Sequence, residues 1–177
     1  MNYGDKILIM GGSCAGKSTT AEKLGKKLNI PVLHMDLYDP YAVGAGPERD
    51  ARKKLMNDSI TNTIKQPKWI IEGIYQWYSF EERMNAADVL VLLHSPAIGR
   101  IWRYIKTCAL RQKRHGRNGF SAKNFRFEHV WYMLRHQDAP YELIKQTAQK
   151  YKNLRVVELK SFREIDAFIN SYTRKGR

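Results

Sequence analysis

The sequence predicts an α/β fold, a three-layer sandwich in which helices cover both faces of a parallel sheet. Five short apolar runs alternate with segments of helical periodicity, and continuous apolar strands are typical of parallel sheets buried on both faces. The chain has 177 residues, of which 43% are hydrophobic and 27% charged, the composition of a globular protein. Because it contains no repeat, low-complexity tract or linker-like break, we expect one domain over residues 1–177.

Strand and helix signals follow one another in a regular order. The expected strands cover residues 6–10, 31–35, 69–72, 89–94 and 155–159. Between the second and third strands, Pro47 is typical of the first turn of a helix. Leu55, Ile60 and Ile64 mark one apolar face of that helix.

Helix starts can also be located by their capping patterns. Ser79 with Glu82, and Ser161 with Glu164, each form the capping-box spacing that begins a helix. Residues 95–96, Ser-Pro, are expected to begin a long helix. Its apolar positions at helical spacing are Ile98, Ile101, Trp102, Ile105 and Cys108.

The charge of the chain points to anionic partners. Its 31 Lys and Arg against 17 Asp and Glu give a formal net charge of +14, which favours nucleotides, nucleic acid or acidic lipid as partners. Residues 89–127 contain no acid. Nine basic residues fall inside that stretch: Arg100, Arg103, Lys106, Arg111, Lys113, Arg114, Arg117, Lys123 and Arg126.

The cysteines and the hydropathy of the chain exclude several classes of protein. Cys14 and Cys108 are far apart and have no metal-type spacing, so we expect free thiols rather than a disulfide or zinc site. No apolar run approaches the roughly 20 residues that a membrane span needs. The amino-terminal residues lack the layout of a signal peptide. We therefore expect a cytoplasmic protein without a membrane partner.

The clearest motif lies between the first strand and the first helix. Gly11-x-x-x-x-Gly16-Lys17-Ser18 matches the phosphate-binding P-loop in its required context. Backbone N–H groups of the loop would surround a β-phosphate, Lys17 would bridge β- and γ-phosphates, and the Ser18 hydroxyl would help to hold Mg²⁺. The alternative is a glycine-rich turn with an incidental lysine. The expected nucleotide-binding residues are Gly11, Gly12, Ser13, Cys14, Ala15, Gly16, Lys17, Ser18 and Thr19.

Two carboxylates follow the next two strands. Asp36 comes at the end of the second strand, where it could take a proton from a substrate hydroxyl or hold metal-bound water. Alternatively it only caps the following turn. Glu72 ends the third strand in the layout of a Walker B acid that orients water on Mg²⁺, or is simply solvated at a strand tip. The candidate metal residues are thus Ser18, Glu72 and Asp36.

Together these blocks resemble the FlaR-related DNA-topology-modulation proteins, a branch of the adenylate-kinase-like P-loop kinases. The resemblance spans nearly the whole chain. It is carried by GGSCAGKST, PVLHMD, WIIEGIY, FEERMNAADVLVLLHSP, the arginine-rich residues 100–117 and VVELKSFREIDAFI. It implies the sheet order 2-3-1-4-5, an ATP site and a basic helical lid, inserted at about residues 100–126.

Two features depart from the family pattern. The third strand ends in Glu72-Gly73 where the family usually has Asp-Gly. Residues 74–77 lack the arginine with which nucleoside-monophosphate kinases generally clamp an acceptor phosphate. Nearby aromatic residues could instead line an acceptor pocket, or form a hydrophobic plug under a long loop. They are Tyr38, Tyr41, Tyr75, Trp77 and Tyr78.

The basic stretch suggests two functions. In kinases of this type, lid arginines close over the transferring phosphoryl group and stabilise its charge; the candidates are Arg111, Arg114 and Arg117. The alternative to a lid is a solvated helix face. The same cations could instead bind DNA or RNA phosphates, although the sequence contains no recognisable nucleic-acid reader.

The expected function is therefore transfer of the γ-phosphoryl group from ATP, with Mg²⁺, to an unidentified small molecule or nucleotide. Asp36 would orient or deprotonate the acceptor, while Lys17 and the lid arginines draw charge from the phosphoryl group. The adenine would lie near residues 161–163. The alternative is an ATP-regulated protein associated with nucleic acid, and a third reading is ATP hydrolysis alone.

Overall fold

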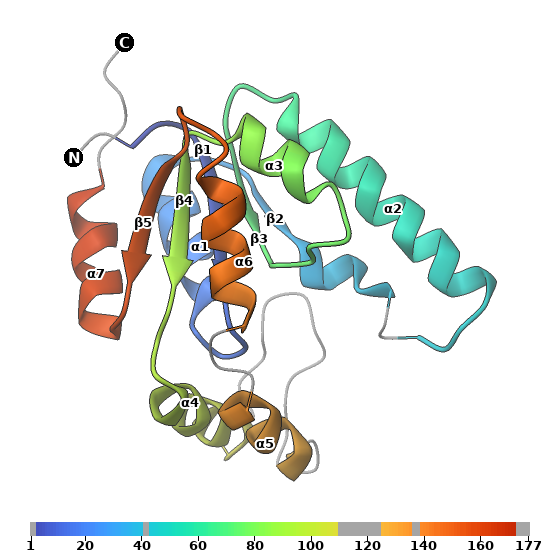
Figure 1. Cartoon of the computed structure of the whole chain (residues 1–177), viewed down its shortest axis with the longest axis vertical. Coiled ribbons are helices and arrows are strands. Elements are labelled where there is room, and N and C mark those ends of the chain that lie inside the picture. Colours follow the sequence, from blue (N-terminus) through green and yellow to red (C-terminus); the bar gives the residue numbers. More distant parts are fainter. Residues whose placement is uncertain (1–2, 41–42, 110–124, 136–138, 173–177) are drawn as a thin grey trace.

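The computed structural model describes residues 3–40, 43–109, 125–135 and 139–172. At its centre is a five-stranded sheet in which every pairing is parallel. The expected α/β class and the sheet order 2-3-1-4-5 are therefore confirmed (Figure 1). The strands are β1 (Lys6–Gly11), β2 (Val32–His34), β3 (Trp69–Glu72), β4 (Val89–Leu93) and β5 (Arg155–Leu159).

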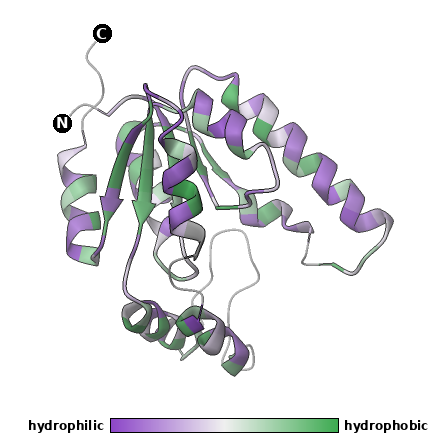
Figure 2. Cartoon of the chain, in the orientation of Figure 1, coloured by the Kyte–Doolittle hydropathy of each residue, from purple (hydrophilic) through white to green (hydrophobic). Residues whose placement is uncertain are grey.

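Alternate residues of the strands enter two separate cores. Ile7 and Ile9 of β1 lie in one hydrophobic cluster, and Leu8 and Met10 lie in another. The sheet is therefore the middle layer of three, and Figure 2 shows its central strands in the hydrophobic colour. The first cluster is covered by α1 (Lys17–Leu28) and α7 (Phe162–Ser171), and the second by α2 (Pro47–Ile64), α3 (Phe80–Ala86) and α6 (Ala139–Ala148).

Two further helices lie beyond the carboxyl ends of the strands (Figure 1). They are α4 (Ala97–Ala109) and α5 (Phe127–Arg135). A third, small core contains Tyr104 and Cys108 of α4, Met133 of α5 and Cys14. Because Cys14 belongs to the loop after β1, these helices pack directly on that loop. Cys14 and Cys108 form no disulfide with each other, and both are buried.

The predicted helix starts have different outcomes. Pro47 is the first residue of α2, as expected. Ser161 caps α7 by accepting a 3.2 Å hydrogen bond from the Glu164 N–H, which confirms that capping box. A helix, α3, does begin after Ser79, but the capping box expected there does not form. Ser79 has a left-handed backbone with φ of 45° and makes no side-chain cap, whereas a capping serine normally needs an extended backbone.

Two predicted helix faces are partly wrong. Leu55 is 53% exposed, and its neighbour Met56 is buried instead. On α4, Ile98 and Trp102 are 80% and 66% exposed. This helix lies past the sheet edge and packs on the loop and α5, so a different face is buried, formed by Ala97, Arg100, Tyr104 and Cys108.

Element ends differ slightly from the prediction. β1 includes Gly11, and β2 ends at His34 because a 3₁₀ turn, Met35–Tyr38 (η1), begins there. β4 ends at Leu93 rather than His94. Within the described ranges, no helix combines the length and the apolar character needed to cross a membrane.

Candidate active site

The loop that joins β1 to α1 has the conformation that its glycines favour. Gly16 has φ of 102°, in the region that side chains rarely adopt. It is the N-cap of α1 and has no side chain, and the first turn of α1 contains no acidic residue. The N–H groups at this helix start are therefore available to a ligand, and a helix N-terminus favours an anion.

Lys17, the first residue of α1, bends back across this loop. Its Nζ donates a hydrogen bond of 3.2 Å to the carbonyl of Gly12. An ammonium in this position can bind a phosphate that also accepts from the loop N–H groups. The nine predicted nucleotide-binding residues, 11–19, run from the last residue of β1 through this loop to the first turn of α1.

The predicted metal residues Ser18 and Glu72 are brought together by the structure. The Ser18 hydroxyl donates to Oε1 of Glu72 at 3.1 Å. Glu72 is 1% exposed, and its second oxygen, Oε2, is buried without a hydrogen-bond partner. A hydroxyl beside an unpartnered carboxylate oxygen fits Mg²⁺, which prefers oxygen ligands and retains several waters.

His34 connects this carboxylate to a second acid. Its Nδ1 lies 3.0 Å from Oε1 of Glu72, and its Nε2 lies 2.8 Å from Oε1 of Glu22. The hydrogen bond to Glu72 raises the pKa of His34, against the opposing effect of burial. The register of the sheet explains the contact with Glu72, because His34 of β2 pairs with Glu72 of β3. His34 therefore holds the Glu72 carboxylate in place.

Asp36 lies on η1, beyond the end of β2, and has a different partner. The Tyr75 hydroxyl donates to Oδ1 of Asp36 at 2.9 Å. The described contacts thus join Ser18 to Glu72 and Asp36 to Tyr75, so the three predicted metal residues form two groups. A carboxylate oriented by a tyrosine suits the handling of a substrate proton.

Arg83 was not singled out by the sequence analysis, yet it shapes the loop after β3. It is fully buried, and its guanidinium donates to the carbonyls of Gly73, Ile74 and Tyr75 at 3.2, 2.9 and 3.0 Å. Burial lowers its pKa to about 9. These bonds hold the chain that presents Tyr75 to Asp36. An arginine inside the first turns of a short helix gives little sequence signal for this role.

Two arginines of α4 lie against the P-loop. A Cβ atom on Gly12 would clash with Nη1 of Arg100, and one on Gly16 would lie 3.1 Å from Nη1 of Arg103. The Arg103 guanidinium also stacks 4.3 Å from the ring centre of Phe162, at the place expected for the adenine. Both arginines belong to the predicted basic stretch. The lid candidates Arg111, Arg114 and Arg117 lie outside the described residues.

The loop has two further polar contacts that the sequence did not reveal. The Gly12 N–H donates to the Tyr141 hydroxyl at 2.8 Å, and this hydroxyl donates to the Leu93 carbonyl at 2.9 Å. Oγ of Ser13 lies 2.9 Å from Nε2 of His129. The loop is therefore held by α5 and α6 as well as by its own glycines.

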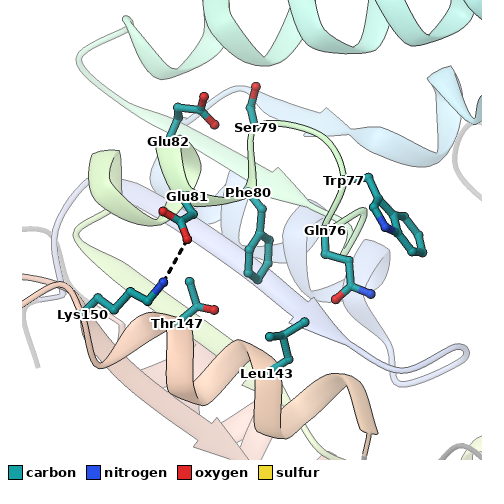
Figure 3. Close-up of a pocket in the computed structure, with 9 residues that line it drawn as sticks. All are labelled: Gln76, Trp77, Ser79, Phe80, Glu81, Glu82, Leu143, Thr147 and Lys150. Atoms are coloured by element: carbon teal, nitrogen blue, oxygen red, sulfur yellow. Dashed lines mark hydrogen bonds and ion pairs between the residues drawn. The ribbon is translucent and has the colours of Figure 1, made fainter.

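The predicted aromatic residues were expected either to line an acceptor pocket or to form a hydrophobic plug, and the described ones do some of each. Tyr78 is buried in the second core, and Tyr38 and Tyr75 pack against it, as a plug would. Trp77 is 72% exposed, and it lines a cavity of about 580 Å³ (Figure 3). Tyr41 lies outside the described residues. The cavity runs between α3 and α6 and is lined by Gln76, Trp77, Ser79, Phe80, Glu81, Glu82, Leu143, Thr147 and Lys150.

Solved structures share this fold at low sequence identity. A shikimate kinase from Bacteroides thetaiotaomicron matches with a TM-score of 0.54 and 16% identity over 93% of each chain. A deoxyadenosine kinase from M. mycoides with bound dATP matches with a TM-score of 0.55 and 17% identity, over 93% of this chain and 97% of that chain. A gluconokinase from Sinorhizobium meliloti matches with a TM-score of 0.52 and 16% identity, over 96% and 94%.

These likenesses show the fold alone, which the chain shares with the three solved kinases. No protein-family model and no curated protein matches the sequence. The narrower resemblance to FlaR-related proteins stays a prediction.

Proposed function

We propose that the chain is a phosphotransferase that moves the γ-phosphoryl group of ATP to a small-molecule acceptor. One observation carries the proposal: beside the loop that Lys17 spans, the Ser18 hydroxyl meets a buried Glu72 whose second oxygen has no partner. A phosphate-binding loop next to such a carboxylate is what a nucleotide with Mg²⁺ requires. The likeness to three solved kinases supports the same conclusion.

Each residue of the loop side has a part in this scheme. Loop N–H groups bind phosphate oxygens, and Lys17 neutralises charge on the transferring group. Ser18 and Glu72 would hold Mg²⁺, whose charge would offset that of the triphosphate. His34 occupies Oε1 of Glu72, which leaves Oε2 as the oxygen that would bind the metal. Most of the rate enhancement then comes from positioning and electrostatics.

The acceptor side is organised by Asp36. Its carboxylate would accept the proton of an acceptor hydroxyl as that oxygen attacks phosphorus, and Tyr75 fixes its orientation. The three solved kinases are named for small-molecule substrates, which supports an acceptor of that size. A lid formed by Arg111, Arg114 and Arg117 remains part of the proposal as a prediction.

The experiment that tests this function is a screen of small metabolites for ADP release in the presence of ATP and Mg²⁺. We expect one chemical class of acceptor to stimulate turnover, and Lys17→Ala to abolish it. Lys23→Ala is the matched control, because Lys23 lies on the same helix and pairs with Asp166 at the surface. Absence of ATP binding by the wild-type chain would contradict the proposal.

Asp36→Asn separates binding from chemistry. We expect about a 10²- to 10⁴-fold lower rate with an unchanged affinity for ATP, as for loss of a general base. Equal turnover would remove Asp36 from the chemistry. The nucleic-acid alternative predicts duplex binding that weakens by roughly 10³ to 10⁵ between about 50 and 200 mM salt, and this measurement distinguishes it.

A further inference from the structure

Arg100 is a buried cation that makes little use of its hydrogen-bonding groups. Only 2% of the residue is exposed. Among the described residues its side chain makes one hydrogen bond, from Nη2 to the Met133 carbonyl, which is 3.5 Å long. Its Nε is buried and has no partner there. A guanidinium has five N–H donors and a permanent charge, so most of this capacity is unused.

The described part of the chain supplies no counter-charge for it. No ion pair there involves Arg100, and residues 89–127 contain no acid at all. Burying an unpaired charge opposes folding. A ligand that carries negative charge would remove this cost.

The position of Arg100 indicates which ligand that is. The guanidinium lies so close to the first turn of the P-loop that Gly12 has no space for a Cβ atom. The N–H of Gly12 is bound to the Tyr141 hydroxyl. The main chain at Gly12 is thus bonded to α6 and lies against the Arg100 guanidinium of α4, directly before the loop N–H groups to which the proposed function assigns the phosphates.

We infer that Arg100 is a positioning residue of the nucleotide site, whose buried charge is neutralised by the polyphosphate that the loop binds. This inference rests on the proposed nucleotide binding, but not on the identity of the acceptor. In the free protein, the unpaired guanidinium opposes folding. With a polyphosphate bound, it increases affinity, and the increase is larger for a more highly charged ligand. Lysine would keep the charge but lose the planar fork.

The test compares Arg100→Met, Arg100→Leu, Arg100→Lys and the control Lys106→Met, which removes an exposed charge from the same helix. Urea unfolding of the free proteins is measured together with calorimetric binding of ATP, ADP and inorganic tripolyphosphate. We expect Arg100→Met to unfold at a higher urea concentration than the wild type. We expect it to bind ATP and tripolyphosphate about 10- to 100-fold more weakly, as for loss of a buried positive charge beside the phosphates, and to lose less affinity for ADP.

The controls separate this role from simple packing. Arg100→Lys should recover part of the affinity, and Lys106→Met should bind like the wild type within about twofold. Equal binding of tripolyphosphate by Arg100→Met and the wild type overturns the inference. A lower urea midpoint for both Arg100→Met and Arg100→Leu also overturns it, because the guanidinium then supports the free fold. If the wild type binds neither ATP nor tripolyphosphate, the proposed function fails as well.

Discussion

Arg83 and Arg100 are both buried arginines that form no ion pair among the described residues, but their surroundings differ. Arg83 uses all three nitrogens, on the carbonyls of four residues and the Met35 sulfur. The Arg100 side chain makes one long hydrogen bond among the described residues, and its Nε has no partner there. The first charge is solvated by the protein itself. Among the described residues, the second charge has no such set of acceptors.

The same contrast separates the two sides of the site. On the acceptor side, Arg83 holds the loop after β3, and Asp36 is bound to Tyr75. On the phosphate side, both Arg100 and Glu72 retain a buried polar atom without a partner. Buried polar groups are nearly always satisfied in folded proteins. Other residues, such as Trp69 and Gln76, also have such an atom, but Arg100 and Glu72 carry charge and lie beside the P-loop, which makes them candidates for ligand contacts. Opposite charges at Arg100 and Glu72 suit an anion and a cation respectively.

The largest expected effect comes from Arg83→Met. It leaves three loop carbonyls without their donors, and we expect the free energy of unfolding to fall by about 3 kcal/mol or more. Urea unfolding measures this, with Arg52→Met, at the helix surface and paired with Glu48, as the control. The contrast between the two arginines breaks if Arg83→Met and Arg100→Met change stability in the same direction.

Glu72→Gln tests the role of the Glu72 carboxylate, whose Oε2 is buried without a partner among the described residues. The amide keeps an oxygen that can accept from Ser18 and His34 but removes the charge, so we expect the apparent affinity for Mg²⁺ to fall about 10- to 100-fold. ATP binding without Mg²⁺ should not weaken. Calorimetry with and without the metal measures both. Glu22→Gln is the control, because Glu22 contacts His34 from the other side; an equal loss in that variant would contradict a metal role for Glu72.

The fold could be predicted from the sequence because it depends on local patterns. An apolar run such as Val89–Leu93, in a chain where such runs alternate with helices, indicates a buried parallel strand. The glycines and lysine of the P-loop occupy fixed positions in its motif. Ser18 was predicted from the P-loop pattern and Glu72 from its place at the end of a buried strand, and the structure joins the two by a hydrogen bond.

The remaining contacts depend on tertiary packing that no local pattern specifies. Arg100 and Trp102 are separated by one residue in a basic, apolar helix, and only the packing of α4 on the P-loop makes one buried and the other exposed. Tyr141 lies 129 residues from Gly12 in sequence. The useful signal was the pair Arg100 and Arg103, spaced by three residues at the start of the helix that follows β4.

Tyr141→Phe tests whether Tyr141 and Arg100, the two side chains near Gly12, have different roles. The hydroxyl binds the Gly12 N–H and the Leu93 carbonyl inside the protein. Its removal should lower the free energy of unfolding by about 1–2 kcal/mol, in the free and the ATP-bound protein alike. Arg100→Met should instead weaken only the bound form. Urea unfolding with and without saturating ATP distinguishes them, and a loss restricted to the bound Tyr141→Phe protein would contradict this assignment.

The smallest effect is expected behind Tyr141, where His94 stacks on its ring at 4.0 Å and bonds to Glu158. Burial opposes ionisation of Glu158, but hydrogen bonds to His94 and Lys145 outweigh it and lower the pKa of this carboxyl. A depressed pKa in the folded state stabilises the protein above the unfolded value of about 4.5, and this stability is lost as pH falls through the folded value. Glu158→Gln should therefore cost less than about 1 kcal/mol near neutral pH, and the difference from the wild type should vanish as the pH falls from neutral to below the lowered pKa of Glu158. Urea midpoints measured across this range would contradict the ion-pair interpretation if the difference instead grew in acid.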